Sequence, residues 1–378
     1  MTPKPNPHSF KNLKVALVHD MINEAGGAER VVFSLTKLFP NAPIYTSYVK
    51  KNSPAHRLFS HRKIITSWIN YVPFIDKISS PLRPLIPLIW GSFYFKNYDL
   101  VISSASWYVT KGFRRSKDTK EICYCHTPPR WLYGLTTSVN FQKYYPIRFF
   151  TIITEHIIRL YDQFQSKKVD LFIANSKNVA ARIAKFYRRD SVVVYPPVNL
   201  PIIKIVPKKN YYLVVSRLAG AKGLDLAVKT ATKLNIKLKI AGASAGLSLE
   251  HRQIKKIAGK NIEFLGHVSD EKLWQLYREA KGFLALSTDE DFGITPVESM
   301  ACGTPVIAYA GGGYLETVVD GKTGLFFKDY SINGLSKVIK KFETIKFNPK
   351  VCRAQAEKFS EAIFHQKIKK IISDVIDN

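Results

Sequence analysis

The chain has 378 residues, of which 46% are hydrophobic and 23% are charged. It is therefore too long for one ordinary domain and too apolar to be largely disordered. Lys and Arg outnumber Asp and Glu by 57 to 29, which leaves a net charge of +28. This charge predicts an anionic partner and leaves phosphate-rich ligands, an anionic membrane and nucleic acid open.

The cysteines and the first residues of the chain bear on where the protein is located. The four cysteines show no zinc or disulfide spacing. The start of the chain is polar and rich in proline, unlike a signal peptide, so a cytoplasmic protein is expected.

Short apolar runs alternate with amphipathic stretches of helix length along the whole chain. This alternation predicts an α/β fold with parallel sheets covered by helices. In the first half, strands are expected at residues 14–19, 100–104, 122–126, 171–174 and 192–195. Ligands of α/β proteins bind at the carboxyl ends of strands. Six polar residues fall there: His19, Asp20, Ser103, Ser104, His126 and Asn175.

Residues 50–120 form a region that is both basic and apolar. Its longest apolar stretch, residues 84–95, is too short to span a bilayer. Residues 50–120 hold 13 Lys or Arg and three acids, interleaved with Trp68, Phe74, Trp90 and Phe93. This pattern is typical of a surface that rests on an anionic membrane, with core packing as the alternative. We expect membrane contact within residues 57–120.

A second run of strands follows the prolines at residues 196–201. These strands are expected at residues 212–216, 238–241, 262–265, 283–286 and 305–308. We therefore predict two Rossmann-like domains, over residues 1–195 and 196–353. Residues 354–378 form an amphipathic helix that is expected to pack back toward the first domain.

The segment at residues 290–309, EDFGITPVESMACGTPVIAY, is the most informative of the chain. It predicts a glycine loop, a helix with Thr295 as N-cap and Pro296 as its first residue, and a strand. Backbone N–H groups at a helix start can hold phosphate. Glu290 and Glu298 would face that end, and sugar hydroxyls are suitable donors to their carboxylates.

Each of these residues also has a structural interpretation. Glu298 fits the acid of a capping box, and Glu290 fits a solvated acidic turn. His126 alone is typical of a structural histidine, and paired glycines are common in turns. Glu290 and Glu298 also resemble a glycosidase pair. A glycosidase would leave unexplained two cations, Arg217 and Lys222, which lie between the strand expected at residues 212–216 and the helix after it.

The 290–309 segment resembles the Glu-x7-Glu motif of retaining glycosyltransferase family 4, whose members have the GT-B fold of two facing Rossmann-like domains. Other segments resemble the family in the same order. They are GGAERVV at residues 26–32, YCHTPPRWLYG at 124–134, SRLAGAKGLDLAV at 216–228 and GGGYLETVVDGKTGLFF from residue 311.

The resemblance implies a role for each matching residue. Arg217 and Lys222 are assigned to the donor pyrophosphate, Glu298 to its ribose and Glu290 to the transferred sugar. His126 is assigned to the same sugar from the first, acceptor-side domain. The implied catalytic residues are His126, Arg217, Lys222 and Glu290. The implied donor-binding residues are Gly26, Gly27, Arg217, Lys222, Glu290, Phe292, Gly293, Ile294 and Glu298.

The function implied is transfer of a hexose, with retention, from a nucleotide-sugar to a glycan or lipid-linked acceptor. The wording of the motifs is most similar to bacterial mannosyltransferases of polysaccharide or glycolipid assembly, so mannose from GDP-mannose is expected. No metal or other cofactor is expected, because two cations and helix amides can stabilise the departing nucleotide. The enzyme is expected at the inner face of the cell membrane as a peripheral protein.

Two alternatives remain at this stage. One is a nucleotide-sugar epimerase or glycan phosphorylase on the same fold. The other is a basic nucleic-acid-binding protein, suggested by the charge. Such a protein has no need of paired carboxylates at a phosphate-binding helix start, so nucleic acid is not the expected partner.

Overall fold

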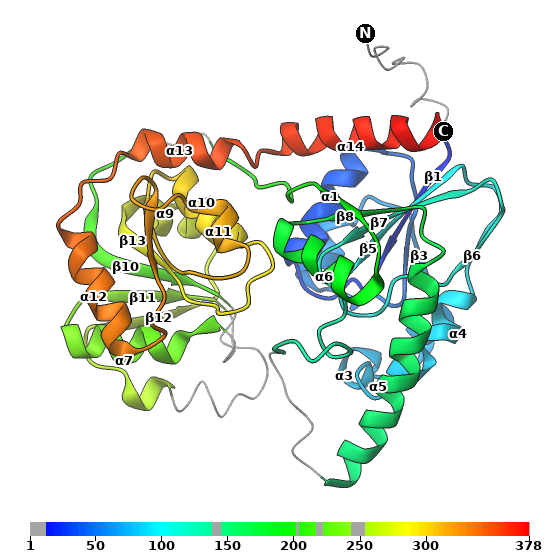
Figure 1. Cartoon of the computed structure of the whole chain (residues 1–378), viewed down its shortest axis with the longest axis horizontal. Coiled ribbons are helices and arrows are strands. Elements are labelled where there is room, and N and C mark those ends of the chain that lie inside the picture. Colours follow the sequence, from blue (N-terminus) through cyan, green and yellow to red (C-terminus); the bar gives the residue numbers. More distant parts are fainter. Residues whose placement is uncertain (1–12, 138–144, 202–203, 217–221, 243–253, 378) are drawn as a thin grey trace. The chain divides into compact units, whose positions relative to one another are not determined.

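A computed structural model describes residues 13–137, 145–201, 204–216, 222–242 and 254–377 of the chain. These residues form two compact units, each built on its own parallel sheet (Figure 1). The first unit comprises the described residues of Met1–Leu135, Asn140–Pro197 and Glu361–Asn378. The second comprises those of Thr136–Val139 and Val198–Ser360.

The first unit has a seven-stranded sheet in the order β3-β2-β1-β5-β7-β8-β9, with every pairing parallel. The strands are β1 (Val15–His19), β2 (Ile44–Thr46), β3 (Ile64–Thr66), β5 (Leu100–Ala105), β7 (Lys120–Cys125), β8 (Leu171–Ala174) and β9 (Ser191–Val193). All five expected strands are present. The two that sequence analysis missed, β2 and β3, have three residues each, too few to show a pattern.

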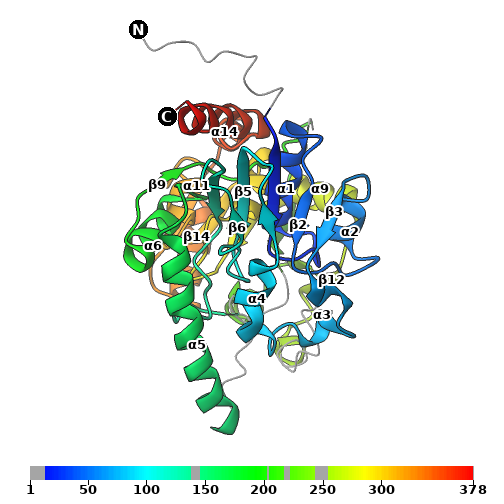
Figure 2. The ribbon, with the colours of Figure 1, turned by 90° about the vertical axis from the view of Figure 1, so that its right-hand side faces the viewer.

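The helices and turns of the first unit are α1 (Gly27–Leu38), α2 (Pro54–Leu58), η1 (Trp68–Tyr71), α3 (Ile75–Ile78), η2 (Arg83–Leu85), α4 (Ile86–Gly91), α5 (Tyr145–Ser166) and α6 (Lys177–Tyr187). A small sheet pairs β4 (Tyr94–Phe95) with β6 (Arg114–Arg115). The 22-residue helix α5 runs out from the body of the unit (Figures 1 and 2).

The central strands of this sheet are buried along almost their whole length. Burial on both faces is typical of parallel sheets that are covered by helices. In the parallel register, His19 of β1 lies opposite Ser104 of β5, and Ser104 lies opposite Tyr124 of β7. The carboxyl ends of these three strands therefore meet at one edge of the sheet.

The expected membrane region is divided between core and surface. Trp90 and Phe93 are buried in the apolar core, so core packing is the correct reading for them. Trp68 and Phe74 are exposed, as a surface role requires. Arg115 forms ion pairs with Glu121 and Asp170, so this part of the basic charge is bound within the fold.

The second unit has a six-stranded parallel sheet in the order β12-β11-β10-β13-β14-β15. Its strands are β10 (Lys209–Val215), β11 (Leu238–Ala241), β12 (Ile262–Gly266), β13 (Ala280–Ala285), β14 (Val306–Tyr309) and β15 (Gly324–Phe327). Its helices are α7 (Leu224–Leu234), α9 (Asp270–Glu279), α10 (Ile294–Ala301), α11 (Tyr314–Thr317), α12 (Ile332–Glu343) and α13 (Pro349–Glu357). The five expected strands are present, and β15 was not expected.

The C-terminal segment forms two helices rather than one. After α13 the chain leaves helical conformation, and α14 (Glu361–Ile376) belongs to the first unit. Phe364 and Ile368 of α14 are buried in the same apolar core as Val31 and Leu35 of α1. The contact includes Ser34 Oγ at 2.8 Å from His365 Nε2, so α14 completes the core of the first unit.

We predict that Phe364→Ala lowers the free energy of unfolding of the first unit by about 3–5 kcal/mol, the usual cost of removing a buried phenyl ring. Urea unfolding measures this change. Lys369→Ala, at an exposed position of the same helix, is the control. A loss below about 1 kcal/mol for Phe364→Ala would show that α14 is not part of the core.

Candidate functional site

Three side chains that follow neighbouring strands of the second sheet come together. Lys222 Nζ lies 2.8 Å from Glu290 Oε2, and the Tyr314 hydroxyl donates to the same oxygen at 3.3 Å. The side chains of Lys222 and Glu290 are 30% and 19% exposed, so the ion pair is open to a ligand. Burial, and then the charge of Glu290, raise the pKa of Tyr314 well above its ordinary value, which keeps its proton available for this bond.

Glycines bring two loops of this site into close contact. Gly312 has a φ of +56°, and a Cβ there would lie 2.3 Å from the carbonyl oxygen of Glu290. The Gly313 N–H donates to that oxygen at 2.9 Å. Since a side chain at Gly312 would push the Glu290 loop away, the glycine run holds Glu290 in place.

The predicted start of α10 is wrong. The helix begins at Ile294, and Gly293 is its N-cap with a φ of +92° and no side-chain capping bond. Thr295 and Pro296 are therefore inside the helix, and Glu298 is beyond the capping-box position. Glycine adopts this left-handed conformation readily. Gly293 can therefore be the N-cap, and the helix includes Thr295 instead of starting after it.

Glu298 is buried in the second unit, where 2% of its surface is exposed. Tyr277 of α9 donates its hydroxyl proton to Glu298 Oε2 at 2.9 Å. Phe292, in the loop before α10, packs edge to face on Phe359 with ring centroids 5.4 Å apart. These contacts fix the loop and α10, and the ribose role of Glu298 stays a prediction.

Arg217 lies outside the described residues, so its implied place beside Lys222 is not seen. Among the residues that are described, no three His, Cys, Asp or Glu side chains come close enough together to hold a metal ion. Independence of metal stays a prediction as well.

His126 follows β7 at the edge of the first sheet. Its Nε2 lies 2.9 Å from Ser104 Oγ, which in turn lies 3.1 Å from His19 Nδ1. All three side chains are buried. Burial, and then the charge of His19, lower the pKa of His126 to about 3, so its imidazole is neutral at physiological pH.

The glycine loop is held by an acid that sequence analysis overlooked. Gly26 is the N-cap of α1 and Gly27 its first residue. The Gly26 N–H donates to Glu29 Oε2 at 2.9 Å, and Glu29 Oε1 lies 3.6 Å from His19 Nε2. An acid three residues after an N-cap is the signal that would have identified this contact.

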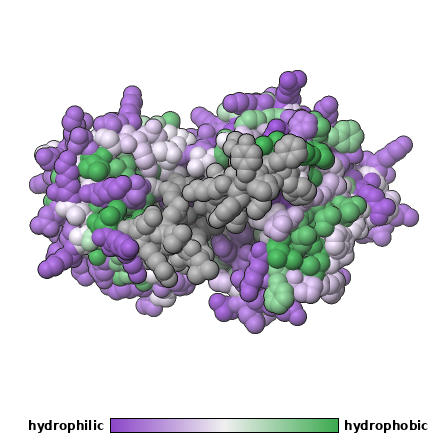
Figure 3. Space-filling view, turned by 90° about the horizontal axis from the view of Figure 1, so that it is seen from below, coloured by the Kyte–Doolittle hydropathy of each residue, from purple (hydrophilic) through white to green (hydrophobic). Residues whose placement is uncertain are grey.

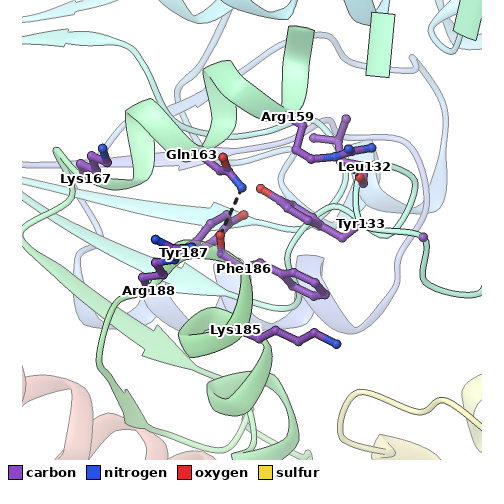
Figure 4. A pocket seen from close by; sticks show the side chains of 10 residues that line it. Leu132, Tyr133, Arg159, Gln163, Lys167, Lys185, Phe186, Tyr187 and Arg188 are labelled. Carbon is purple, nitrogen blue, oxygen red and sulfur yellow. Dashed lines mark hydrogen bonds between the residues drawn. The ribbon is translucent and has the colours of Figure 1, made fainter. Parts of the chain in front are cut away.

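A cavity of about 650 Å³ opens on the first unit where α5 meets α6 (Figure 4). Its charged lining is entirely cationic and comprises Arg159, Lys167, Lys185 and Arg188. Tyr133 and Phe186 stack within the lining with centroids 4.5 Å apart. Residues 132–134 of its lining end the YCHTPPRWLYG segment, but the cavity itself was not predicted, because its residues come from three separate segments.

Two family models match consecutive parts of the chain. Glycosyltransferase Family 4 matches residues 25–201, and Glycosyl transferases group 1 matches residues 199–360. The matches meet close to the boundary between the two units.

Curated relatives are similar at modest identity. The alpha-1,3/1,6-mannosyltransferase ALG2 of Dictyostelium discoideum is 27% identical over 394 residues, which cover 87% of this chain and 90% of that protein. The uncharacterized glycosyltransferase MJ1178 of Methanocaldococcus jannaschii is 25% identical over 227 residues, or 58% of this chain and 64% of that protein. The O-antigen chain mannosyltransferase RfbU of Salmonella typhimurium is 28% identical over 246 residues, or 62% and 66%.

Among solved structures, HepE of Anabaena in complex with UDP and glucose is similar in fold. Its TM-score is 0.68 at 17% identity, and the match covers 96% of this chain and all of that one. The fold class predicted from the sequence, two Rossmann-like domains of the GT-B type, is confirmed.

The chain is a glycosyltransferase of the family-4 type. The resemblance drawn from its motifs is thereby confirmed. Within the described residues, no helix is long and apolar enough to cross a membrane.

We predict that Lys222→Ala and Glu290→Gln each lower turnover about 10²-fold or more, because the resemblance assigns Lys222 to the departing pyrophosphate and Glu290 to the transferred sugar. Initial rates of sugar transfer measure the effect. Lys229→Ala, whose exposed ion pair with Asp225 lies along α7, is the control and keeps normal rates. Normal rates in all three variants would mean that the reaction takes place elsewhere.

Proposed function

We propose that this glycosyltransferase moves mannose from GDP-mannose to a membrane-apposed, lipid-linked glycan with retention at the anomeric carbon. The observation that carries the donor side is the exposed Lys222–Glu290 ion pair beside the glycine-bounded start of α10. Mannose is supported by the relatives ALG2 and RfbU, which are mannosyltransferases. Nothing in the comparisons supports an epimerase, a phosphorylase or a nucleic-acid-binding protein.

The ion pair suits a reaction in which a sugar–phosphate bond breaks. Negative charge builds up on the departing nucleotide diphosphate, and the Lys222 ammonium can stabilise it. Lys222 is followed by Gly223, the N-cap of α7, and Gly293 is the N-cap of α10, so the N-terminal amides of both helices add positive potential. Glu290, an acceptor only, is left to bind hydroxyls of the sugar.

Donor and stereochemistry are tested together. Among UDP-, GDP-, ADP- and TDP-sugars, we expect GDP-mannose to raise the melting temperature most, because it binds only the folded chain. We expect NMR of the first product to show the anomeric configuration of the donor, and a chelator to leave the rate unchanged. Inversion, or inhibition that added metal reverses, would contradict the proposal. If only a UDP-sugar stabilised the chain, the proposed transferase activity would stand, but GDP-mannose would be the wrong donor.

The acceptor side is supported by helix α5, which buries one face in the first unit and has an exposed apolar stripe on the other. One face packs on the unit through Ile158 and the buried Asp162. The opposite stripe is exposed, with between 46% and 58% of each side chain accessible, and comprises Ile153, Ile157, Leu160 and Phe164. Figure 3 shows hydrophobic side chains gathered at the surface of the first unit, on the right.

The charges around this stripe favour an anionic lipid surface as its partner. Lys167 and Lys168 follow the stripe at the end of α5, and Lys185 and Arg188 lie across the cationic cavity. A helix with an apolar stripe and flanking cations rests in the headgroup region of a bilayer. Each nearby cation adds about 1 kcal/mol of attraction to anionic lipid.

We predict that the wild type co-sediments with vesicles of phosphatidylglycerol and phosphatidylcholine, and that Ile157→Ser with Leu160→Ser lowers this binding more than tenfold. His156→Ser, at an exposed position of α5, is the control and binds as the wild type does. Equal binding of all three proteins would contradict a membrane role for α5. A dimer that dissociates in the double variant would instead assign the stripe to a second copy.

A further inference from the structure

A line of polar side chains joins the glycine loop of the first unit to His126. Glu29 accepts from the Gly26 N–H and lies 3.6 Å from His19 Nε2. On the other side of its ring, His19 Nδ1 is 3.1 Å from Ser104 Oγ, which is 2.9 Å from His126 Nε2. The line crosses the ends of β1, β5 and β7, which are neighbours in the sheet.

Charge determines where the protons lie along this line. Burial lowers the pKa of His19, but contact with Glu29 and the charges of Glu29 and Asp20 raise it by more, so the pKa is above its ordinary value. Burial and the His19 charge lower the pKa of His126 to about 3. When one histidine of the pair is charged, it is therefore His19, beside Glu29, and His126 is neutral.

The hydrogen bonds then have one direction. An imidazolium donates from both ring nitrogens, so His19 donates from Nδ1 to Ser104 Oγ. The Ser104 hydroxyl is left to donate its own proton to His126 Nε2. A neutral imidazole that accepts at Nε2 carries its proton on Nδ1. Within the described part of the chain, no hydrogen-bond partner of His126 Nδ1 is seen, so this N–H is available to a ligand.

We infer that Ser104 and His19 are positioning residues that hold His126 as its Nδ1–H tautomer, so that it donates a hydrogen bond to an oxygen of the bound sugar. The inference rests on the proposed function for its ligand, since His126 is assigned to the transferred sugar. Glu29 extends the line to Gly26 through its ion pair with His19, so the glycine loop and His126 are linked by one chain of polar contacts.

Deprotonation of His19 reverses the direction of the hydrogen bonds from His19 through Ser104 to His126. The proton that His19 keeps is the one on Nε2, beside Glu29, so Nδ1 becomes an acceptor for the Ser104 hydroxyl. Ser104 then accepts from His126 Nε2–H, and His126 Nδ1 is left as an acceptor. The charged groups beside His19 are Glu29 and Asp20, and both oppose this change. Activity that needs the Nδ1–H donor is present below the pKa of His19 in the folded chain and is lost as pH rises through it.

The direct test is nitrogen NMR of protein labelled with 15N-histidine, in which the His126 signals are assigned with His126→Gln. We expect a single Nδ1–H tautomer at neutral pH in the wild type, and a mixture of tautomers in Ser104→Ala. We expect kcat of Ser104→Ala to fall about 10²-fold, as for a misplaced reacting group, with little change in the donor KM. Thr36→Ala, which removes a buried hydroxyl of α1 outside this line, is the control and changes neither.

Glu29→Gln tests the charge without removing a side chain from the sheet. The amide still accepts from the Gly26 N–H, but it no longer raises the pKa of His19. We expect the alkaline fall of kcat to move to lower pH, together with the tautomer change. An unchanged His126 tautomer in both Ser104→Ala and Glu29→Gln would overturn the inference. Because the NMR measurement needs no substrate, absence of mannosyl transfer would count against the proposed function and not against this arrangement.

Discussion

The constraint on which both sites depend is the parallel hydrogen bonding of the two sheets. Parallel strands all point the same way, so the residues that follow them collect at one edge. In the first unit this edge gathers His19, Ser104 and His126. In the second it gathers Lys222 and Glu290. Residues separated by 22 to 85 positions therefore become hydrogen-bond partners without any local sequence signal.

Close backbone contact and buried charge then fix these side chains. The Gly312–Gly313 turn holds the Glu290 loop at a distance that no other residue type allows. In the first unit, Lys111 and Asp162 form an ion pair at 2.8 Å with side chains that are 1% and 0% exposed. Burial lowers the pKa of Lys111, but Asp162 and the two neighbouring cysteines together raise it by more, so the lysine stays charged.

That ion pair explains how α5 can leave an apolar stripe uncovered. Tyr133 donates its hydroxyl proton to Asp162 Oδ2 at 2.8 Å, and Lys111 Nζ lies 3.3 Å from the hydroxyl of Tyr187. Three segments therefore meet at one carboxylate on the inner face of α5. Removing one partner of such a buried pair is costly, so the inner face is fixed whatever the outer face contacts.

The sequence predicted most of the fold because the strands that matter are continuous apolar runs. It did not predict β2, β3 and β15, which have only three or four residues and depend on their neighbours for definition. It placed Thr295 as a helix cap on residue type, whereas a left-handed glycine begins the helix. The end of α13 could not be predicted either, since no helix-breaking residue marks it. The helix ends there because the chain passes from the second unit to the core of the first.

For the sites, sequence reasoning found residues but not most of their partners. Glu290 and Lys222 were expected in one site, and they do meet. The contacts of Tyr314 with Glu290 and of Tyr277 with Glu298 depend on side-chain packing, which no spacing rule predicts. His19 and Ser104 were expected at the right edge of the sheet, but their link to His126 needed the register of three strands.

The claim that the donor is bound at the carboxyl edge of the second sheet is tested most directly by hydrogen–deuterium exchange with and without GDP-mannose. The account predicts slower exchange of backbone amides in residues 289–295 and 311–314, where the glycine turn meets the start of α10. Residues of α12, on the same unit, should exchange at an unchanged rate. Unchanged exchange in residues 289–295 and 311–314 at saturating GDP-mannose would contradict the account.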